Sequence, residues 1–392
     1  MARAAANAGA RVTARAAAGS HADAQRALVR NAAERGGALR IVGAGTWLNA
    51  GAPCSATARL DIASLDRVVQ YEPGDLTLTV GAGCTLERIA ALTAEHGQWL
   101  TLDPFGSAGG TIGATVATGS YGPLASAFGT PRDHVLGCEF ITGNGDVINA
   151  GGRVVKNVAG FDLVRLVTGS WGTVGAITEL TLRLRARPEL DQTLAIRIAG
   201  RTTAAMAEEA WRWLKQSDYA PSAAELVSPT LAVRVGLAAE PWLLCRFGGN
   251  RSFVRAAVDS AASLGAVQEV STDTWLTLRE SDNNAAAVFR ASALPSRIAA
   301  TYSACESLVN RFGGHMSATL GRGVVRCVIP DAGRFGAGDV AHLSSTCTVV
   351  AEVLPASCWA APTMDPVRTR LAHAVLRTFD PREIMNPGIL RQ

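Results

Sequence analysis

The sequence predicts an α+β fold, and three observations lead to this prediction. Segments with a helical apolar repeat and segments with strand alternation are interleaved along the 392 residues. Glycine is abundant, with 40 residues, and gathers where predicted strands end. After Pro188 the pattern changes to regular strands and helices joined by short links. A chain of this length has room for two or three domains.

The first hundred residues combine helices with strands that end at glycine. An apolar face over residues 22–37 predicts a helix that ends at Gly36 and Gly37, and a strand follows over 38–45. Residues 75–83 alternate apolar and polar side chains, as in a half-buried strand. Thr85 then caps a predicted helix over 86–97. This order resembles βαβ units with glycine at the strand exits.

Residues 101–134 are predicted to lack regular structure, because they hold seven glycines, three prolines and few large apolar residues. Such a long irregular stretch is uncommon in a compact domain unless it wraps around a ligand. The next segment, 135–152, predicts a hairpin that turns at Asn144 and Gly145. A further strand is expected over 176–188, where Pro188 ends it.

Beyond Pro188 the pattern favours an antiparallel sheet covered by helices on one face. The expected strands lie at 194–200, near 224–237, at 242–247, at 324–329 and at 346–353, and the expected helices at 203–217, 252–265, 297–314 and 366–379. The chain is therefore divided into a disordered extension over residues 1–20, a first domain over 21–188, a second over 189–359, and a C-terminal segment over 360–392.

Composition excludes several classes of protein. The net charge of +4 comes without any Lys/Arg run of five, so nucleic acid is not an implied partner. No apolar run reaches 18 residues, so no membrane span is expected. The eight cysteines form no C-x-x-C pair and no zinc spacing, which favours reduced, buried thiols in a cytoplasmic protein. Residues 1–20 have a transit-peptide composition, but a disordered or misassigned start is the preferred interpretation.

The segment RIVGAGTW, residues 40–47, predicts a phosphate-binding turn after a strand. A dinucleotide-binding Rossmann unit is the first alternative, with Asp61 on the ribose. That alternative fails because Leu48 stands where a third glycine is needed, and residues 48–62 read as a loop and a strand instead of a helix. Asp61 is then an ordinary residue of the following strand.

Four separate glycine clusters point to one extended ligand. They lie at 43–45, 81–83, 104–119 and 169–175. Glycine allows both a positive φ and a close approach of the backbone to a ligand. A single phosphate needs one such site, whereas a dinucleotide with an extended flavin needs several. Tight turns between strands are the alternative explanation for any one cluster.

Five segments resemble the PCMH-type FAD-binding domain of the vanillyl-alcohol oxidase and para-cresol methylhydroxylase superfamily. They are GAGT (43–46), DPFGSAGGTIGA (103–114), FGTPRDHVLG (128–137), residues 155–184 and DPREIMNPG (380–388). Within that superfamily the chain is most similar to the FAD-binding E-type subunits of glycolate oxidase. The resemblance implies a two-subdomain FAD-binding domain, an α+β cap domain for substrate or subunit contacts over 189–359, and a C-terminal segment that returns to the FAD domain.

The resemblance implies noncovalent FAD, because the pyrophosphate loop contains no histidine and Cys84 reads as a buried thiol. For Arg132 and Lys156, the alternative interpretation is that they are ordinary surface residues. The residues expected to contact FAD are Val42, Gly43, Ala44, Gly45, Thr46, Pro104, Gly106, Gly110, Thr111, Gly113, Ala114, Thr118, Gly119, Arg132, Lys156, Gly172, Gly175, Ile177 and Asn386.

The catalytic residues expected from the resemblance are Arg290, which would bind a substrate carboxylate, and His315, which would take a proton. Members of the superfamily that dehydrogenate D-2-hydroxy acids are expected to carry paired metal-binding histidines. No two of the six histidines here lie within five residues of each other, so no metal site is expected. This departure argues against hydroxy acid chemistry in the chain by itself.

The resemblance therefore implies an FAD-binding subunit of a glycolate oxidase or dehydrogenase complex, beside a larger catalytic FAD subunit and an iron–sulfur subunit. The complex would oxidise glycolate, a 2-hydroxy acid, to glyoxylate and pass electrons to an acceptor other than oxygen. The alternatives are a stand-alone FAD-linked D-2-hydroxyacid dehydrogenase and a non-catalytic assembly subunit that FAD stabilises. The expected location is the cytoplasm, with a peripheral position at the inner membrane through the partner subunits as a variant.

Overall fold

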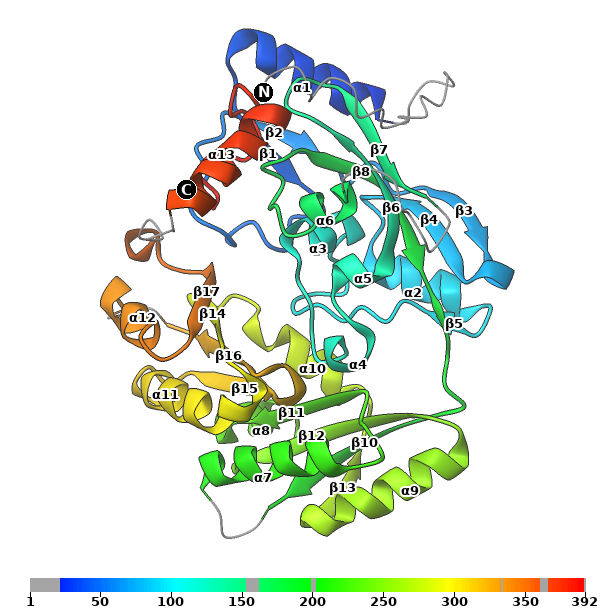
Figure 1. Cartoon of the computed structure of the whole chain (residues 1–392), viewed down its shortest axis with the longest axis vertical. Helices are drawn as coiled ribbons and strands as arrows, with labels where there is room; N and C mark the ends of the chain where they lie inside the picture. Colours follow the sequence, from blue (N-terminus) through cyan, green and yellow to red (C-terminus); the bar gives the residue numbers. More distant parts are fainter. Residues whose placement is uncertain are drawn as a thin grey trace.

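The computed structural model describes residues 22–152, 162–198, 202–331, 333, 335–359 and 366–390, and Lys156 lies outside these ranges. Two sheets organise the described part of the chain (Figure 1). The first has five strands in the order β3-β4-β8-β6-β7, and all its pairs are antiparallel. The strands are β3 (Val68–Glu72), β4 (Thr77–Gly81), β6 (Val135–Ile141), β7 (Val147–Gly151) and β8 (Ala176–Arg183).

Two smaller sheets accompany the five-stranded one. A parallel pair joins β1 (Leu39–Val42) to β2 (Ala58–Asp61), and an antiparallel pair joins β5 (Gln98–Trp99) to β9 (Arg185–Ala186). The helices of this part are α1 (Asp23–Arg35), α2 (Leu86–Ala94), α3 (Ile112–Thr118), α4 (Ala125–Phe128), α5 (Pro131–His134), α6 (Leu163–Val167) and α13 (Pro366–Phe379). The chain end returns beside α1 and β1 (Figure 1).

The core of this first part lies between the five-stranded sheet and α3. Leu78, Leu180 and Phe140 of the sheet are fully buried, as are Ile112 and Val116 of α3. The alternation predicted for β4 and β8 is confirmed, because apolar side chains two residues apart share the buried face. The core therefore holds α3 in a fixed place behind the loop that follows β1.

The hairpin predicted at Asn144 and Gly145 is confirmed. Gly145 adopts φ +77° and donates its N–H to the Thr142 carbonyl at 2.9 Å, which closes the turn between β6 and β7. The helices predicted at 22–37, 86–97 and 366–379 are also present, at α1, α2 and α13.

The expectation of no regular structure over 101–134 was wrong. Three short helices lie there: α3, α4 and α5. The sequence of α3, IGATVAT, is short and made of small side chains, so it shows no apolar repeat. Its two ends carry the usual signals, because Thr111 caps its start and Gly119 closes it at φ +63°.

The second sheet has eight antiparallel strands in the order β13-β10-β12-β11-β15-β16-β14-β17. They are β10 (Leu190–Arg197), β11 (Ala223–Val227), β12 (Trp242–Gly249), β13 (Ala266–Val270), β14 (Ala287–Ser292), β15 (His315–Thr319), β16 (Val324–Ile329) and β17 (Thr348–Val353). One face packs against α7 (Thr203–Gln216), α9 (Arg251–Ala261) and α11 (Ile298–Arg311). The predicted antiparallel sheet with helices on one face is confirmed.

The other face of this sheet is turned toward the first part of the chain (Figure 1). The strand predicted near 224–237 ends early, at Val227, because Ser228 caps α8 (Pro229–Arg234) and Pro229 starts it. A further helix, α10 (Thr274–Arg279), lies at the junction. Its end contacts the glycine-rich segment: Gly106 N–H donates to the Arg279 carbonyl at 2.8 Å, and Arg279 Nη1 donates to the Pro104 carbonyl at 3.1 Å.

None of the helices in the described ranges is both long enough and apolar enough to cross a bilayer.

Candidate functional site

The loop that follows β1 is shaped by glycine. A Cβ on Gly43 would lie 2.3 Å from Oγ1 of Thr111, the residue that caps α3. Gly45 adopts φ +78°, a conformation that side chains with a Cβ rarely take. The loop therefore lies directly against the start of α3.

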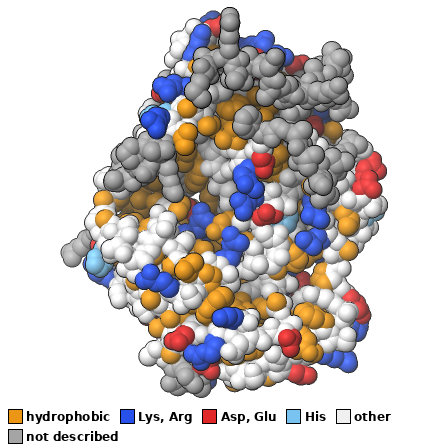
Figure 2. All heavy atoms as spheres, viewed as in Figure 1, with side chains coloured by type: hydrophobic (Ala, Val, Ile, Leu, Met, Phe, Trp, Pro, Cys, Tyr) orange, Lys and Arg blue, Asp and Glu red, His pale blue; other side chains and the backbone are white. Residues whose placement is uncertain are grey.

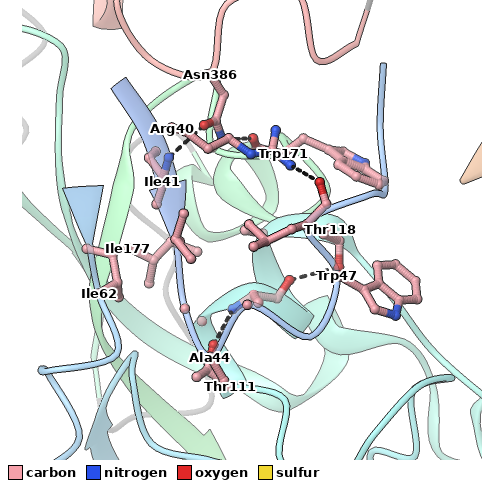
Figure 3. A pocket seen from close by; sticks show the side chains of 18 of the residues that line it. Arg40, Ile41, Ala44, Trp47, Ile62, Thr111, Thr118, Trp171, Ile177 and Asn386 are labelled. Atoms are coloured by element: carbon pink, nitrogen blue, oxygen red, sulfur yellow. Dashed lines mark hydrogen bonds between the residues drawn. The ribbon is translucent and has the colours of Figure 1, made fainter. Parts of the chain in front are cut away.

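This loop forms one wall of an open cavity, which holds about 740 Å³ of empty space when open solvent is included (Figure 3). The other walls come from α3, from the turn before β8 and from the C-terminal segment. The lining residues are Arg40, Ile41, Val42, Gly43, Ala44, Gly45, Thr46, Trp47, Leu48, Ile62, Thr111, Gly113, Ala114, Ala117, Thr118, Trp171, Gly172, Gly175, Ile177, Asn386 and Ile389.

Asn386 ties the C-terminal segment to this cavity. Its side chain accepts a hydrogen bond from Ile41 N–H at 2.8 Å and donates one to the Trp171 carbonyl at 2.7 Å (Figure 3). Its own N–H donates to the Leu39 carbonyl at 2.9 Å, so the segment extends the edge of β1. Asn386 is buried and adopts φ +46°, which Asn tolerates better than most residues.

Arg40 is the one cation among the described residues of the lining. Its Nη2 donates to the carbonyls of Leu48 and Ala50 at 3.4 and 3.3 Å. Its Nη1 is buried and has no hydrogen-bond partner within the described part of the chain. A buried donor without a partner is costly, so this atom fits an anionic group in the cavity.

Thirteen of the residues predicted to contact the ligand meet at this cavity. They are Val42, Gly43, Ala44, Gly45, Thr46, Thr111, Gly113, Ala114, Thr118, Gly172, Gly175, Ile177 and Asn386. Sequence reasoning missed eight lining residues, and all of them except Ile62 are within three residues of a predicted position: Arg40, Ile41, Trp47, Leu48, Ile62, Ala117, Trp171 and Ile389. Adjacency to the glycine turns was the only signal available for them.

Five other predicted residues lie outside the lining. Gly106 and Gly110 stand behind the loop, where a Cβ would come within 2.7 Å of Trp47 Nε1 and 3.4 Å of Thr46 Oγ1. Pro104 contacts Arg279, and Gly119 ends α3 against Gly169. Arg132 is exposed, with its Nε 3.8 Å from Asp133 Oδ1.

The glycine cluster at 81–83 serves packing. A Cβ on Gly81 would lie 2.1 Å from the Leu65 carbonyl oxygen, and one on Gly83 would lie 2.3 Å from that of Ile62. Gly113 N–H also donates to the Ala82 carbonyl at 2.8 Å. This cluster therefore positions α3 and lines none of the cavity.

A cluster of charged side chains lies between the two sheets, near one end of the cavity. Arg290 of β14 stacks over the Tyr121 ring, with its guanidinium carbon 5.0 Å from the ring centre, and Arg326 of β16 lies 4.1 Å from the centre of Phe105. Figure 2 shows one face of the molecule, with Lys and Arg side chains near its middle, where the two parts of the molecule meet. Arg290 therefore lies at the junction of the two parts, and its expected role in binding a substrate carboxylate stays a prediction.

His315 has a different environment. It is 1% exposed on β15, and burial together with Arg234 and Arg326 lowers its pKa to about 4. It does not line the cavity described above.

Two buried carboxyl groups lie at the same junction. Burial raises the pKa of Glu225, on β11, to about 8, and neither of its oxygens has a hydrogen-bond partner of good geometry in the described structure. Asp103 accepts hydrogen bonds from Leu124 N–H, and burial raises its pKa to about 6. The described residues contain no group of three His, Cys, Asp or Glu side chains arranged to hold a metal ion.

Comparison with known proteins indicates which cofactor the chain binds. Residues 13–151 match the family model described as "FAD binding domain". The chain carries an FAD-binding domain of the PCMH type. The structure of p-cresol methylhydroxylase with substrate bound shares the fold, with a TM-score of 0.72, 15% identity, and coverage of 93% of this chain and 86% of that chain.

Two curated relatives share sequence with the FAD-binding domain. The glycolate oxidase subunit GlcE of Escherichia coli (strain K12) is 39% identical over 34% of this chain and 39% of the relative. The glycolate oxidase subunit GlcD of Bacillus subtilis (strain 168) is 36% identical over 39% of this chain and 33% of the relative. The chain therefore matches less than half the length of either relative.

The cavity suits FAD on structural grounds. The lining is mostly apolar and closed by glycine-rich backbone, as a flat flavin ring and its chain require. Arg40 Nη1, which has no partner in the described structure, and the amides of residues 43–46, which line the cavity, would provide donors for a pyrophosphate. Such a lining would hold a cofactor through its backbone more than through side chains.

Proposed function

We propose that this chain is an FAD-binding subunit of a glycolate oxidase or dehydrogenase complex. The complex would oxidise glycolate to glyoxylate and deliver electrons to an acceptor other than oxygen, through a larger catalytic FAD subunit and an iron–sulfur subunit. Both curated relatives carry the name of glycolate oxidase subunits, which supports this assignment. The proposed location is the cytoplasm, at the inner membrane where the partners place it.

The proposed FAD site consists of the thirteen predicted lining residues together with Arg40. Amides of the loop 43–46 and Arg40 would bind the pyrophosphate, and Asn386 would fix the wall beside β1. The FAD would be held noncovalently, because the lining residues that the structure describes include no His and no Cys. When bound, FAD supplies a group that accepts a hydride or electrons, and the chain supplies position and shielding from water.

The observation that carries the subunit role is the composition of the cavity lining. Among the described residues that form it there is no His, Asp or Glu, so no side chain there can take a proton from a hydroxy acid. A flavin held without a base suits electron transfer more than the oxidation of an alcohol. The proposed role is therefore electron relay within the complex.

One observation favours a second candidate, a stand-alone D-2-hydroxyacid dehydrogenase. Arg322 lies 4.9 Å from the Tyr121 ring centre and pairs with no carboxylate within the described ranges. It donates only to the Ala125 carbonyl, at 3.3 Å, and its Nε is buried without a partner. A free arginine at this junction would suit a substrate carboxylate.

Adding glycolate to the purified, FAD-loaded chain without oxygen separates the candidates. The subunit role predicts that the flavin absorbance of the isolated chain stays unchanged, and that it bleaches when the catalytic subunit is present. Bleaching of the isolated chain would contradict the relay role and favour the stand-alone dehydrogenase. If the flavin of this chain never bleaches in the active complex, the result would favour the third alternative, a non-catalytic assembly subunit that FAD stabilises.

A further inference from the structure

Glu352 lies at the centre of the charge cluster between the two sheets. Its Oε1 lies 2.7 Å from Arg290 Nε, and its Oε2 lies 2.7 Å from Arg326 Nη1. The side chains of Glu352 and Arg326 are each 4% exposed, and that of Arg290 is 17% exposed. One carboxylate therefore joins two guanidinium groups that come from neighbouring strands, β14 and β16.

The backbone of β17 is shaped to deliver this carboxylate. Val288 pairs with Val353 and Phe289 pairs with Ala351, so Glu352 is an extra residue with no partner on β14. Such a bulge changes the direction of the extra residue's side chain from the one that regular strand pairing would give it. The Glu352 carbonyl also accepts a hydrogen bond from Gly51 N–H at 2.8 Å, and Gly51 closely follows the loop that lines the FAD cavity.

The two arginines are held in place from the other side by rings of the FAD-binding domain. Arg290 lies over Tyr121 and Arg326 over Phe105, at 5.0 and 4.1 Å from the ring centres. Asp282 forms a second ion pair with Arg326, and its Oδ2 lies 2.5 Å from Arg326 Nη2. With Glu352 in place, the two arginines have two carboxylates and no free charge for a third anion.

We propose that Glu352 is an internal anion which occupies the position where Arg290 and Arg326 would otherwise hold the carboxylate of a small hydroxy acid. This inference rests on the proposed function and gives it a physical cause. Two guanidinium groups about one carboxylate form a recognition site for glycolate or a similar anion. A tethered carboxylate outcompetes a free one, because its effective concentration is high.

Removing the tethered carboxylate opens the site. The variants are Glu352→Ala and Glu352→Gln, both loaded with FAD, and the probes are oxalate and glycolate, with sulfate as the control anion. We expect oxalate to bind each variant at least about tenfold more tightly than wild type, a difference of about 1.4 kcal/mol. Binding is measured by the rise in melting temperature and by the change in flavin absorbance, since the site adjoins the FAD cavity.

Asp191→Asn is the matched control, because Asp191 also pairs with an arginine of this sheet, and its two oxygens accept hydrogen bonds from Arg246 at 2.8 and 2.5 Å. Oxalate is expected to leave its flavin spectrum unchanged. The proposal is overturned if the folded Glu352 variants bind oxalate no more tightly than wild type does. It is also overturned if oxalate changes the flavin spectrum of Asp191→Asn as much as that of the Glu352 variants. Should Glu352→Ala fail to fold, Glu352→Gln alone decides. FAD content, recorded for every variant, separates this outcome from failure of the flavoprotein assignment.

Discussion

Gly43 gives the sharpest test at the scale of a single residue. A Cβ there would meet Thr111 Oγ1 at 2.3 Å, so Gly43→Ala must displace either the loop or the cap of α3. We expect FAD affinity to fall at least about tenfold, a loss of about 1.4 kcal/mol. The measurement is the amount of flavin released by acid from the purified protein, per chain.

Gly74→Ala is the control for that substitution. A Cβ on Gly74 meets nothing within 4 Å, and its φ is not in the left-handed range. Full flavin content is expected for it. If Gly43→Ala retained as much flavin as Gly74→Ala, the loop would not be the FAD contact.

Glu225 predicts how stability depends on pH. Burial raises its pKa from 4.5 to about 8, so the folded protein keeps a proton that the unfolded chain loses at lower pH. The stability that this proton contributes is lost as the pH rises toward 8. Between pH 6.5 and 8, the free energy of unfolding of wild type is expected to fall by about 2 kcal/mol more than that of Glu225→Gln.

Denaturant titration at the two pH values measures this difference. The comparison with Glu225→Gln isolates Glu225, because Asp103, with a pKa of about 6, and His315, with a pKa of about 4 against 6.5 in the unfolded chain, titrate in both proteins. Equal slopes for wild type and Glu225→Gln would show that Glu225 is ionised in the folded protein.

The residues that could be located from the sequence are those that belong to local motifs. Gly43, Gly45 and Asn386 belong to local motifs, and the structure places all three at the cavity. The pairing of Arg290 with Glu352 lies beyond such reasoning. It depends on β14 and β17 being neighbours and on a bulge of one residue, and neither is written in the local sequence.

At the scale of elements, the C-terminal segment is fixed by Asp380. Its buried carboxylate accepts hydrogen bonds from Ile384 N–H at 3.1 Å and from Met385 N–H at 2.8 Å. These bonds hold the segment that places Asn386 beside β1. Asp380→Ala is expected to lower the free energy of unfolding by about 2 kcal/mol and to weaken FAD retention.

The measurement is chemical denaturation of the variant with and without added FAD. Exposed Glu87, on α2, gives a control, because Glu87→Ala should change neither quantity. Unchanged stability and flavin content in Asp380→Ala would mean that the segment is held by other contacts.

Long elements with a clear apolar pattern were predictable, and short ones were not. Helices α1, α7 and α11 each show the helical apolar repeat over 13 or 14 residues. Helix α8 has only six residues, and its signal was the Ser228–Pro229 pair at its start. That pair was overlooked because the residues around it, LVSPTLAVRV, have the high apolar content of a strand.

At the scale of the whole molecule, the FAD cavity and the charge cluster are joined through backbone. Gly51, Gly106 and Ala125 each hydrogen-bond to groups of the second part of the chain: Glu352, Arg279 and Arg322. We propose that the chain divides near residue 188 into an FAD-binding domain over 21–188 and a cap over 189–359, with 360–392 returning to the former. The glycine-rich segment 101–134 then contacts both domains.

The central claim is that this chain holds FAD in the cavity behind β1, and flavin content tests it most directly. The purified chain, after incubation with FAD and removal of the excess, is precipitated with acid, and the released and retained flavin are measured. We expect about one FAD per chain, all of it released, and a higher melting temperature than the flavin-free protein. No retained flavin and no rise in melting temperature with added FAD would contradict the claim.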